Sequence, residues 1–383
     1  MHRRPDSLQS VEMQEYDVQV QGAGVVGRSL ALALSRAGFR VALTSLAPAA
    51  APVADVRAYA LNAASVELLR SLKVWDALPA HAATPVLDMH VQGDAAHAEL
   101  DFSAWQQRVS ALAWIVDAAV LEHELASAVR FAPHITAVDV GATVRAPLTA
   151  LCEGKTSISR AALGVRFDRQ DYGHQAIAAR LTSTLPHQGL ARQWFRSPDV
   201  LALLPLDTPQ PEHSFALVWS LPDAQAAALM AADDASFVDQ LMHATQGQAG
   251  ALALAAPRAT WPLMRAQAAP WCGPGWVLLG DAAHVVHPLA GQGLNLGLAD
   301  VVALVQVLGD REPWRSLGDE KLLRRYARER LAKTWAMGQL TDGLLRLYAQ
   351  TAPPVRELRN HGMNLVNHLT PLKRWLTARA LNS

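Results

Sequence analysis

The chain has 383 residues, of which 51% are hydrophobic and 18% charged, and its formal net charge is zero. This composition excludes disordered and fibrous proteins, and the length is sufficient for two domains. No apolar stretch reaches the roughly 18–20 residues of a membrane-spanning helix, and two cysteines predict no disulfide framework. We therefore expect a cytoplasmic protein, and we predict no nucleic-acid partner.

The predicted elements begin with a leader and a strand–helix–strand unit. Residues 1–15 are mixed in charge and lack an apolar run, so we expect a disordered leader. Residues 16–21 alternate like a strand, an apolar helix covers 28–37, and a second strand follows at 39–43. Later patterns predict helices at 61–72 and 118–129, strand segments at 86–102, 176–180 and 200–206, short strands within 135–151, and mainly helix from residue 294.

A glycine-rich turn, Gly22-x-Gly24-x-x-Gly27, lies between the first strand and its helix. Gly22 permits a tight bend, Gly24 lets the backbone approach a pyrophosphate, and Gly27 lets the helix pack on the strand. Val26 lies within the same turn and is included among the cofactor contacts. An acidic residue normally ends the second strand and binds the ribose; here Ser45 is the candidate for that place.

A second segment, residues 276–300, carries a more specific pattern. Its apolar strand ends in Gly280-Asp281, where the carboxylate is placed to accept a hydrogen bond from a polyol chain. A proline and a glycine-rich turn then lead into a helix, whose open N–H groups can stabilise negative charge on a reduced flavin ring. The cofactor contacts predicted in this segment are Gly280, Asp281, Pro288, Gly291, Gln292, Gly293, Leu294 and Asn295. The nearby His284 and His287 have only Asp281 as an acidic neighbour, so we expect no metal site.

The pattern G-D-A-A-H-x-x-H-P-x-A-G-Q-G-x-N-x-G at 280–297 resembles the FAD-dependent aromatic-ring monooxygenases, most closely their ubiquinone-biosynthesis hydroxylase branch. Segments at 55–61, 171–176, 203–206, 324–330 and 358–360 resemble the same branch. The resemblance implies an α/β fold with a glutathione-reductase-like, Rossmann-type FAD-binding domain. An antiparallel β-sheet substrate domain and a helical C-terminal region complete that fold.

The resemblance also implies a reaction and further site residues. Reduced FAD and O₂ would form a flavin hydroperoxide that passes one oxygen to a phenol carrying a polyprenyl chain. The flavin-face loop with Pro288, Gly291 and Gln292 is the catalytic candidate, and no protein base is assigned. Arg57 is expected to approach the flavin. Glu153 replaces an aspartate that assists the nicotinamide donor, so the electron donor is either NAD(P)H or an unidentified reductant.

These patterns divide the chain as follows. We predict a discontinuous FAD-binding domain at 16–85, 115–165 and 268–330, a substrate domain at 86–114 and 166–267, and a C-terminal helical region at 331–383. Residues 321–383 hold twelve Lys or Arg residues against three acidic ones. This basic tail, with an amphipathic helix predicted from Thr370 to Ala380, is expected to meet an anionic membrane surface or other quinone-biosynthesis proteins, which would make the protein peripheral to the membrane.

Two alternatives share the cofactor motifs. A hydroxylase of a small soluble phenol or benzoate differs in pocket size, which the sequence does not reveal. The second alternative is a non-catalytic relative that binds flavin or quinone within a biosynthetic complex. It stays open because Ser45 and Glu153 depart from the family pattern.

Overall fold

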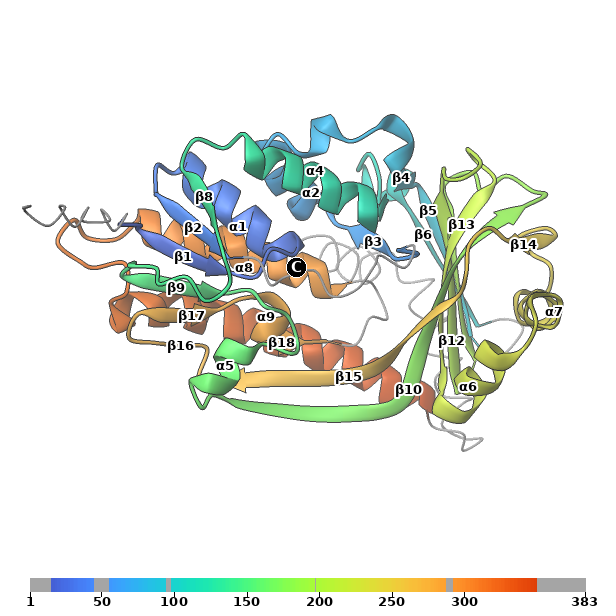
Figure 1. The fold of residues 1–383 in the computed structure, drawn as a ribbon. Coiled ribbons are helices and arrows are strands. Elements are labelled where there is room, and N and C mark those ends of the chain that lie inside the picture. The colour runs from blue at the N-terminus through green and yellow to red at the C-terminus, as the bar shows by residue number, and fades with distance from the viewer. Residues whose placement is uncertain (1–14, 45–54, 94–97, 197, 287–291, 350–383) are drawn as a thin grey trace, which may run out of the picture.

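The computed structural model describes residues 15–44, 55–93, 98–196, 198–286 and 292–349. Figure 1 shows two parts side by side, a parallel sheet covered by helices and a large antiparallel sheet. A small three-stranded sheet lies between them. The predicted leader, Ser45, residues 287–291 and the tail from 350 onward lie outside the described residues.

The parallel sheet is built from short apolar strands that are distant in the sequence. Its order is β16-β17-β9-β1-β2-β8, and all neighbours are parallel except β16 and β17. The strands are β1 (Val18–Gln21), β2 (Val41–Thr44), β8 (Ile135–Val138), β9 (Leu148–Leu151), β16 (Cys272–Gly273) and β17 (Trp276–Leu278). The helices that accompany them are α1 (Val25–Arg36), α4 (Ala118–Arg130), α5 (Ile158–Ala162), α8 (Gln292–Gly309) and α9 (Glu320–Ala349). Buried Val, Leu and Ala side chains of both layers form one core, as expected for a sheet covered on its faces.

Nine strands of the described part form the second sheet, in the order β18-β15-β10-β13-β12-β11-β5-β6, with β14 also paired to β10. The strands are β5 (Asp88–Gln92), β6 (Glu99–Ser103), β10 (Arg166–Ser183), β11 (Leu190–Arg196), β12 (Asp199–Leu206), β13 (Ser214–Pro222), β14 (Leu252–Leu254), β15 (Ala259–Ala269) and β18 (His284–Val285). Alternate residues such as Ile177, Leu203 and Leu217 pack with α6 (Asp223–Ala231) and α7 (Asp234–Thr245). This alternation leaves the opposite face turned toward the rest of the molecule.

The third sheet has the antiparallel order β3-β7-β4, from β3 (Ala58–Leu61), β7 (Ala113–Asp117) and β4 (Ala83–Val86). Its residues share a core cluster with Leu206 of the nine-stranded sheet, so it connects the two large parts. The helices α2 (Ala63–Ser71) and α3 (Ala104–Gln107) follow β3 and β6.

The predicted fold class is confirmed, and the differences are local. Helix α1 begins at Val25 instead of residue 28 because Gly27 is part of the helix and packs directly on the preceding turn. The strand predicted at 176–180 is the end of an 18-residue strand. Residues 166–173 of that strand are mostly exposed and charged, because they form a two-stranded ribbon with β15, so they show no apolar alternation. The three-stranded sheet and the helices α6 and α7 were not predicted.

Candidate active site

The glycine turn combines two close backbone contacts with one open position. Gly22 has a φ of +104°, and a Cβ added to it would lie 2.4 Å from the Cys152 carbonyl oxygen. A Cβ on Gly27 would lie 1.8 Å from the Gly22 carbonyl oxygen, whereas one on Gly24 would have nothing within 4 Å. Gly24 caps α1 without any side-chain hydrogen bond, and the first turn holds no acid. Free N–H groups thus adjoin open space, as a bound pyrophosphate requires.

Val26 connects this turn to the second motif. A Cβ on Gly280 would lie 3.3 Å from the Val26 side chain, and one on Gly297 would lie 2.7 Å from it. Gly280 also has a φ of +58°, a left-handed conformation that glycine adopts at no cost. The loop at 280 and helix α8 therefore close on Val26, which brings the two predicted cofactor segments together.

Asp281 lies in a 3-10 turn, Gly280–Ala282, and its side chain is exposed to solvent. None of the described residues donates a hydrogen bond to its carboxylate. Desolvation by the surrounding protein raises the pKa of Asp281, while His284 and Lys155 lower it in part. The carboxylate is thus available as an acceptor for a ligand hydroxyl, which fits its predicted contact with the ribityl chain.

A buried carboxylate holds this turn from behind. Asp300 of α8 accepts hydrogen bonds from the Gly280 amide at 2.9 Å and from Arg330 Nε at 2.7 Å. A hydrogen bond of 2.6 Å also joins its Oδ2 to His284 Nε2. Burial alone would raise the pKa of Asp300, but His284 and Arg330 outweigh that effect and the pKa lies below its usual value. The orientation of Gly280-Asp281 is therefore fixed by a charged group with no solvent exposure.

Glu153 is part of a third segment of the same site. Its carboxylate accepts hydrogen bonds from Ser157 Oγ at 2.5 Å, from Ser159 Oγ at 2.9 Å and from the Ser159 amide at 3.1 Å. Ser159 Oγ also lies 2.7 Å from Gln21 Oε1, at the end of β1, so both acceptors compete for its one hydroxyl hydrogen. Glu153 thus anchors the start of α5 beside the glycine turn, and its direct contact with a cofactor stays a prediction.

Arg160 links that third segment to the second motif. Its guanidinium donates to the Ala282 carbonyl and to the Lys155 carbonyl, both at 2.9 Å, and lies over the Phe167 ring at 3.5 Å. The side chain is buried, so these contacts are shielded from water. The segments around residues 22–27, 152–160 and 280–297 therefore form one continuous site.

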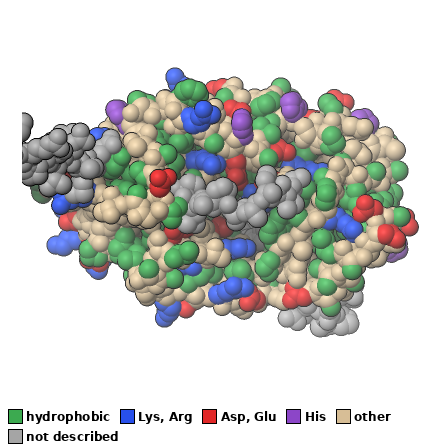
Figure 2. All heavy atoms as spheres, in the orientation of Figure 1, with side chains coloured by type: hydrophobic (Ala, Val, Ile, Leu, Met, Phe, Trp, Pro, Cys, Tyr) green, Lys and Arg blue, Asp and Glu red, His purple; other side chains and the backbone are tan. Residues whose placement is uncertain are grey.

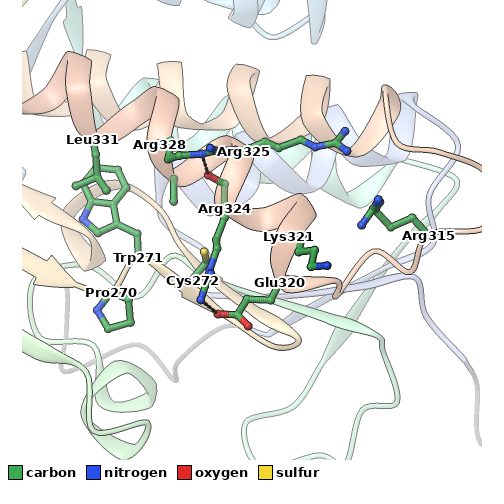
Figure 3. A pocket seen from close by; sticks show the side chains of 11 residues that line it. Pro270, Trp271, Cys272, Arg315, Glu320, Lys321, Arg324, Arg325, Arg328 and Leu331 are labelled. Carbon is green, nitrogen blue, oxygen red and sulfur yellow. Dashed lines mark hydrogen bonds and ion pairs between the residues drawn. The ribbon is translucent and has the colours of Figure 1, made fainter.

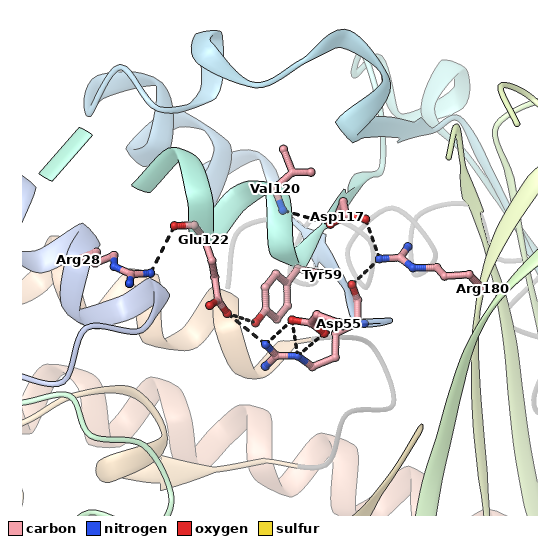
Figure 4. A network of polar contacts seen from close by, with 8 residues as sticks. Arg28, Asp55, Tyr59, Asp117, Val120, Glu122 and Arg180 are labelled. Carbon is pink, nitrogen blue, oxygen red and sulfur yellow. Dashed lines mark hydrogen bonds and ion pairs between the residues drawn. The ribbon is translucent and has the colours of Figure 1, made fainter. Parts of the chain in front are cut away.

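Two acids, Asp55 and Glu122, hold Arg57 at the edge of this site, and Figure 4 labels both acids. Its Nε and Nη2 pair with both carboxylate oxygens of Asp55, and Nη2 lies 3.1 Å from Glu122 Oε1 on α4. The hydrogen bond to Asp55 raises the pKa of Arg57 despite partial burial, so the guanidinium stays charged. Arg28 donates to the Glu122 carbonyl at 3.3 Å, which ties α1 to the same helix.

The remaining predicted residues are placed unequally. Asn295 accepts from the Asn62 amide and Ser65 Oγ and donates to the Ala60 carbonyl, so its side chain holds α2 and β3 against α8. A Cβ on Gly293 would meet nothing within 4 Å, and the half-buried Leu294 packs on a hydrophobic cluster. Gln292 begins α8, but its side chain is not described; Ser45, Pro288 and Gly291 lie outside the described residues.

Several supporting residues were missed by the sequence reasoning: Asp300, Arg330, Glu122, Arg160 and Arg180. Asp300 lies in the segment 276–300, and its spacing of three residues from Gly297 and seven from Gly293 places it on the same side of the predicted helix, which was the available signal. Arg330 lies in the segment 324–330 that resembles the family, but its role was not assigned. Glu122, Arg160 and Arg180 are joined to the site only by tertiary contacts, for which a single sequence contains no signal.

A separate hollow of about 710 Å³ lies between α9 and the segment Pro270 to Cys272, apart from the glycine turn (Figure 3). Its floor includes Trp271 and Cys272, and five basic side chains line it: Arg315, Lys321, Arg324, Arg325 and Arg328. Arg324 pairs with Glu320, and Arg315 and Arg325 pair with Glu312. Lys321 and Arg328 have no carboxylate partner in the part of the chain that is described. On the face seen in Figure 2, by contrast, acidic and basic side chains are interspersed.

Among the residues that the structure describes, no group of three or more His, Cys, Asp or Glu side chains is arranged to hold a metal ion. No helix among those residues is long and apolar enough to cross a bilayer.

Known proteins share both the fold and the sequence. A family model described as "FAD binding domain" matches residues 15–341, and the chain therefore belongs to this FAD-binding family. It is 30% identical to the 3-demethoxyubiquinol 3-hydroxylase of Escherichia coli K12, over 96% of this chain and 99% of that protein. It is 28% identical to the human mitochondrial ubiquinone biosynthesis monooxygenase COQ6, over 95% and 92% of the two chains. The solved structure of p-nitrophenol 4-monooxygenase PnpA from Pseudomonas putida DLL-E4 matches with a TM-score of 0.76 at 18% identity, covering 97% and 99%, which is a likeness of fold.

Within that family the chain is an FAD-dependent aromatic monooxygenase, and it groups with the ubiquinone-biosynthesis hydroxylases. The predictions of FAD as cofactor and of a flavin-dependent hydroxylase are thereby confirmed. Of the two departures that suggested a non-catalytic relative, Glu153 is accommodated by two serines beside an intact glycine turn, and Ser45 lies outside the described residues.

Proposed function

We propose that the protein hydroxylates the ring of a phenol that carries a polyprenyl chain and is an intermediate of ubiquinone biosynthesis. The observation that supports this best is the continuous site formed by the glycine turn, the Glu153 segment and the Gly280-Asp281 turn. Its relatives named as ubiquinone hydroxylases extend over nearly the whole chain. Bound FAD would supply the activation of O₂ and the two-electron chemistry of the ring hydroxylation.

The chain's own residues have distinct tasks in this proposal. The N–H groups that follow Gly24 hold the pyrophosphate, and Asp281 accepts a hydrogen bond from the ribityl chain. Asp300 fixes the Gly280-Asp281 turn, and Arg57 contributes a positive charge near the flavin. The assignment of Pro288, Gly291 and Gln292 to the flavin face stays a prediction from the sequence. The electron donor is NAD(P)H or another reductant.

Metabolite analysis of a deletion strain tests the substrate class. We expect a prenylated precursor that lacks one ring hydroxyl to accumulate, and ubiquinone to fall. Purified enzyme supplied with a reductant should hydroxylate a prenylated phenol in preference to unsubstituted phenol or 4-hydroxybenzoate. Unchanged ubiquinone in the deletion strain, together with turnover of the small phenols alone, would support the small-phenol alternative instead.

We also propose that the basic C-terminal region brings the enzyme to an anionic membrane, where a polyprenylated substrate is dissolved. Four basic side chains at the start of α9, with Arg315 just before the helix, support this surface, and the tail beyond residue 350 adds further Lys and Arg residues. Each basic residue near an anionic surface contributes about 1 kcal/mol. Dissolved salt largely screens this attraction beyond a distance of about 10 Å at 0.1 M ionic strength.

Deletion of residues 370–383 tests this second proposal. The intact protein should bind vesicles containing phosphatidylglycerol at low salt and dissociate as salt is raised. The deleted protein should bind them more weakly while it retains FAD, and deletion of residues 1–14 should change neither property. Absence of vesicle binding by the intact protein at low salt would refute the membrane surface, and loss of FAD on deletion would make the segment structural.

A further inference from the structure

The face of the nine-stranded sheet that looks toward β3 and α4 is lined by small residues. The large side chains of the same strands point to the opposite face of the sheet, where they pack against α6 and α7. Three strands in register contribute to the inward face: Ala178 pairs with Val218 and Val218 with Ala202, while Arg180 pairs with Ala216 and Ala216 with Leu204. Leu204 contacts the core cluster that includes Ala58 and Ala60 of β3. On this face Val218, Ala202 and Leu204 remain partly exposed.

One charged side chain stands on this apolar face. Arg180 is 7% exposed, and its Nη2 donates to the Arg57 carbonyl at 2.6 Å and to Asp117 Oδ2 at 3.0 Å. Figure 4 shows its guanidinium extending from the sheet to the start of α4. Asp117 caps that helix through a 3.1 Å hydrogen bond from the Val120 amide. Arg180 thus connects the nine-stranded sheet to the segment that holds Arg57.

The other terminal nitrogen, Nη1, is buried and has no hydrogen-bond partner in the described part of the chain. A buried donor without an acceptor costs about 1–3 kcal/mol, so such groups are uncommon unless a ligand or water completes them. A single unmet donor among alanine and valine side chains is suited to one oxygen atom on an otherwise apolar molecule.

We propose that Arg180 Nη1 binds the ring oxygen of the substrate, while the small-residue face of β10, β13 and β12 contacts its apolar part. The inference rests on the proposed function, because it assigns a phenol with an apolar substituent to this face. Arg180 is then a specificity residue, since it selects an oxygenated ring over a hydrocarbon of the same shape. Through Nη2 it also holds the Arg57 main chain, which places the bound oxygen beside the flavin-contact segment.

The test compares two probes of similar shape, 2-geranylphenol and geranylbenzene, with the FAD-loaded enzyme. Binding is measured by the change in flavin absorbance of the oxidised protein. The wild type should bind the phenol roughly tenfold to a hundredfold more tightly, the range of a hydrogen bond to a charged donor. In the variant Arg180→Met/Asp117→Asn that preference should fall to about twofold or less, with geranylbenzene affinity unchanged.

The paired substitution avoids a stranded charge, because removing one member of a buried ion pair is strongly destabilising. Asparagine retains the side-chain oxygen that caps α4. Arg192→Met is the matched control, because Arg192 also has a buried Nη1 without a hydrogen-bond partner in the described part of the chain. Arg192 lies two residues from Trp194 on β11 and therefore on the face of the sheet that packs against α7. It should leave the preference for the phenol intact.

Each outcome is decisive. If the paired variant keeps the preference for the phenol, Arg180 does not recognise the oxygen. If that variant fails to bind FAD, Arg180→Lys decides, because lysine keeps the charge beside Asp117 but lacks the second donor nitrogen; an unchanged preference then overturns the inference. If the wild type hydroxylates prenylated phenols while the variants still bind 2-geranylphenol more tightly than geranylbenzene, only the proposed role of Arg180 is refuted. If the wild type neither binds nor hydroxylates them, the proposed function falls as well.

Discussion

The two glycines Gly24 and Gly27 should respond in opposite ways to a larger side chain. A Cβ at Gly27 would lie 1.8 Å from the Gly22 carbonyl oxygen, where real Cβ contacts stay beyond 3.0 Å. Gly27→Ala therefore forces α1 away from the turn by about 1.2 Å, the difference of those two distances. Because the obstacle is backbone, the free energy of unfolding of the apoprotein should fall by at least about 1–3 kcal/mol, the usual cost of overpacking.

Gly24→Val should leave the fold intact and remove the cofactor. Nothing lies within 4 Å of a Cβ at this position, and its backbone is extended, with a φ of −76° and a ψ of −174° that valine also adopts. Apoprotein stability should change by less than about 1 kcal/mol. FAD affinity should fall at least roughly a hundredfold, because a branched side chain occupies the space of the pyrophosphate, and that factor equals about 2.7 kcal/mol.

Urea unfolding followed by tryptophan fluorescence measures the first quantity, and FAD titration followed by flavin fluorescence measures the second. Gly38→Ala is a control away from the cofactor site: it also has open space around its Cβ, but its φ of +87° should produce a stability loss without any change in FAD affinity. Full FAD content in Gly24→Val would show that the pyrophosphate does not lie on this turn. Wild-type stability in Gly27→Ala would refute the close helix-to-turn contact.

Two further predictions concern the second motif. Asp281→Ala should weaken FAD binding by about 1.5–3 kcal/mol, the range for a hydrogen bond to a charged group, and an unchanged titration curve would remove the carboxylate from the ribityl contact. Asp300→Asn should lower the free energy of unfolding by about 3–5 kcal/mol, because it strands the buried Arg330; the exposed Asp310→Asn should cost under about 0.5 kcal/mol. Because the pKa of Asp300 is depressed, its contribution is present above the unfolded value of about 3.9 and is lost as pH falls through the folded pKa. Stability of the wild type that does not fall more steeply than that of Asp300→Asn on acidification would contradict this.

The parts of the fold that the sequence predicted are those with local signals. The strand–turn–helix unit and α4 have apolar periodicity and end residues that mark them, and both formed within a few residues of the predicted bounds. The first half of β10 has no such signal, because six of its residues 166–173 are exposed and form no apolar face. The three-stranded sheet joins strands from residues 58, 83 and 113, and such pairing is decided by tertiary packing.

The site shows the same division. The glycines could be predicted because the backbone at these positions requires them. Gly22, Gly27 and Gly280 all have close contacts or positive φ values that disfavour a side chain. The residues that orient the motifs are ordinary charged residues of helices and strands. Arg160 acquires its role only when α5 packs against the 280 turn, and no spacing in the sequence distinguishes it from a surface arginine. Arg330 lies in a segment that resembles the family, but its pairing with Asp300 depends on the packing of α9 against α8.

The long ribbon of β10 and β15 has a geometric consequence. One end adjoins α5 and the Glu153 segment, and the other end belongs to the nine-stranded sheet, so this pair of strands is one of the connections between the two parts (Figure 1). Its pairing shifts register between Asp171 and His174, where Gly173 has a φ of +66°. An irregularity of this kind bends the strand that carries it. The bend at Gly173 therefore helps to set the direction in which the nine-stranded sheet leaves the Glu153 segment.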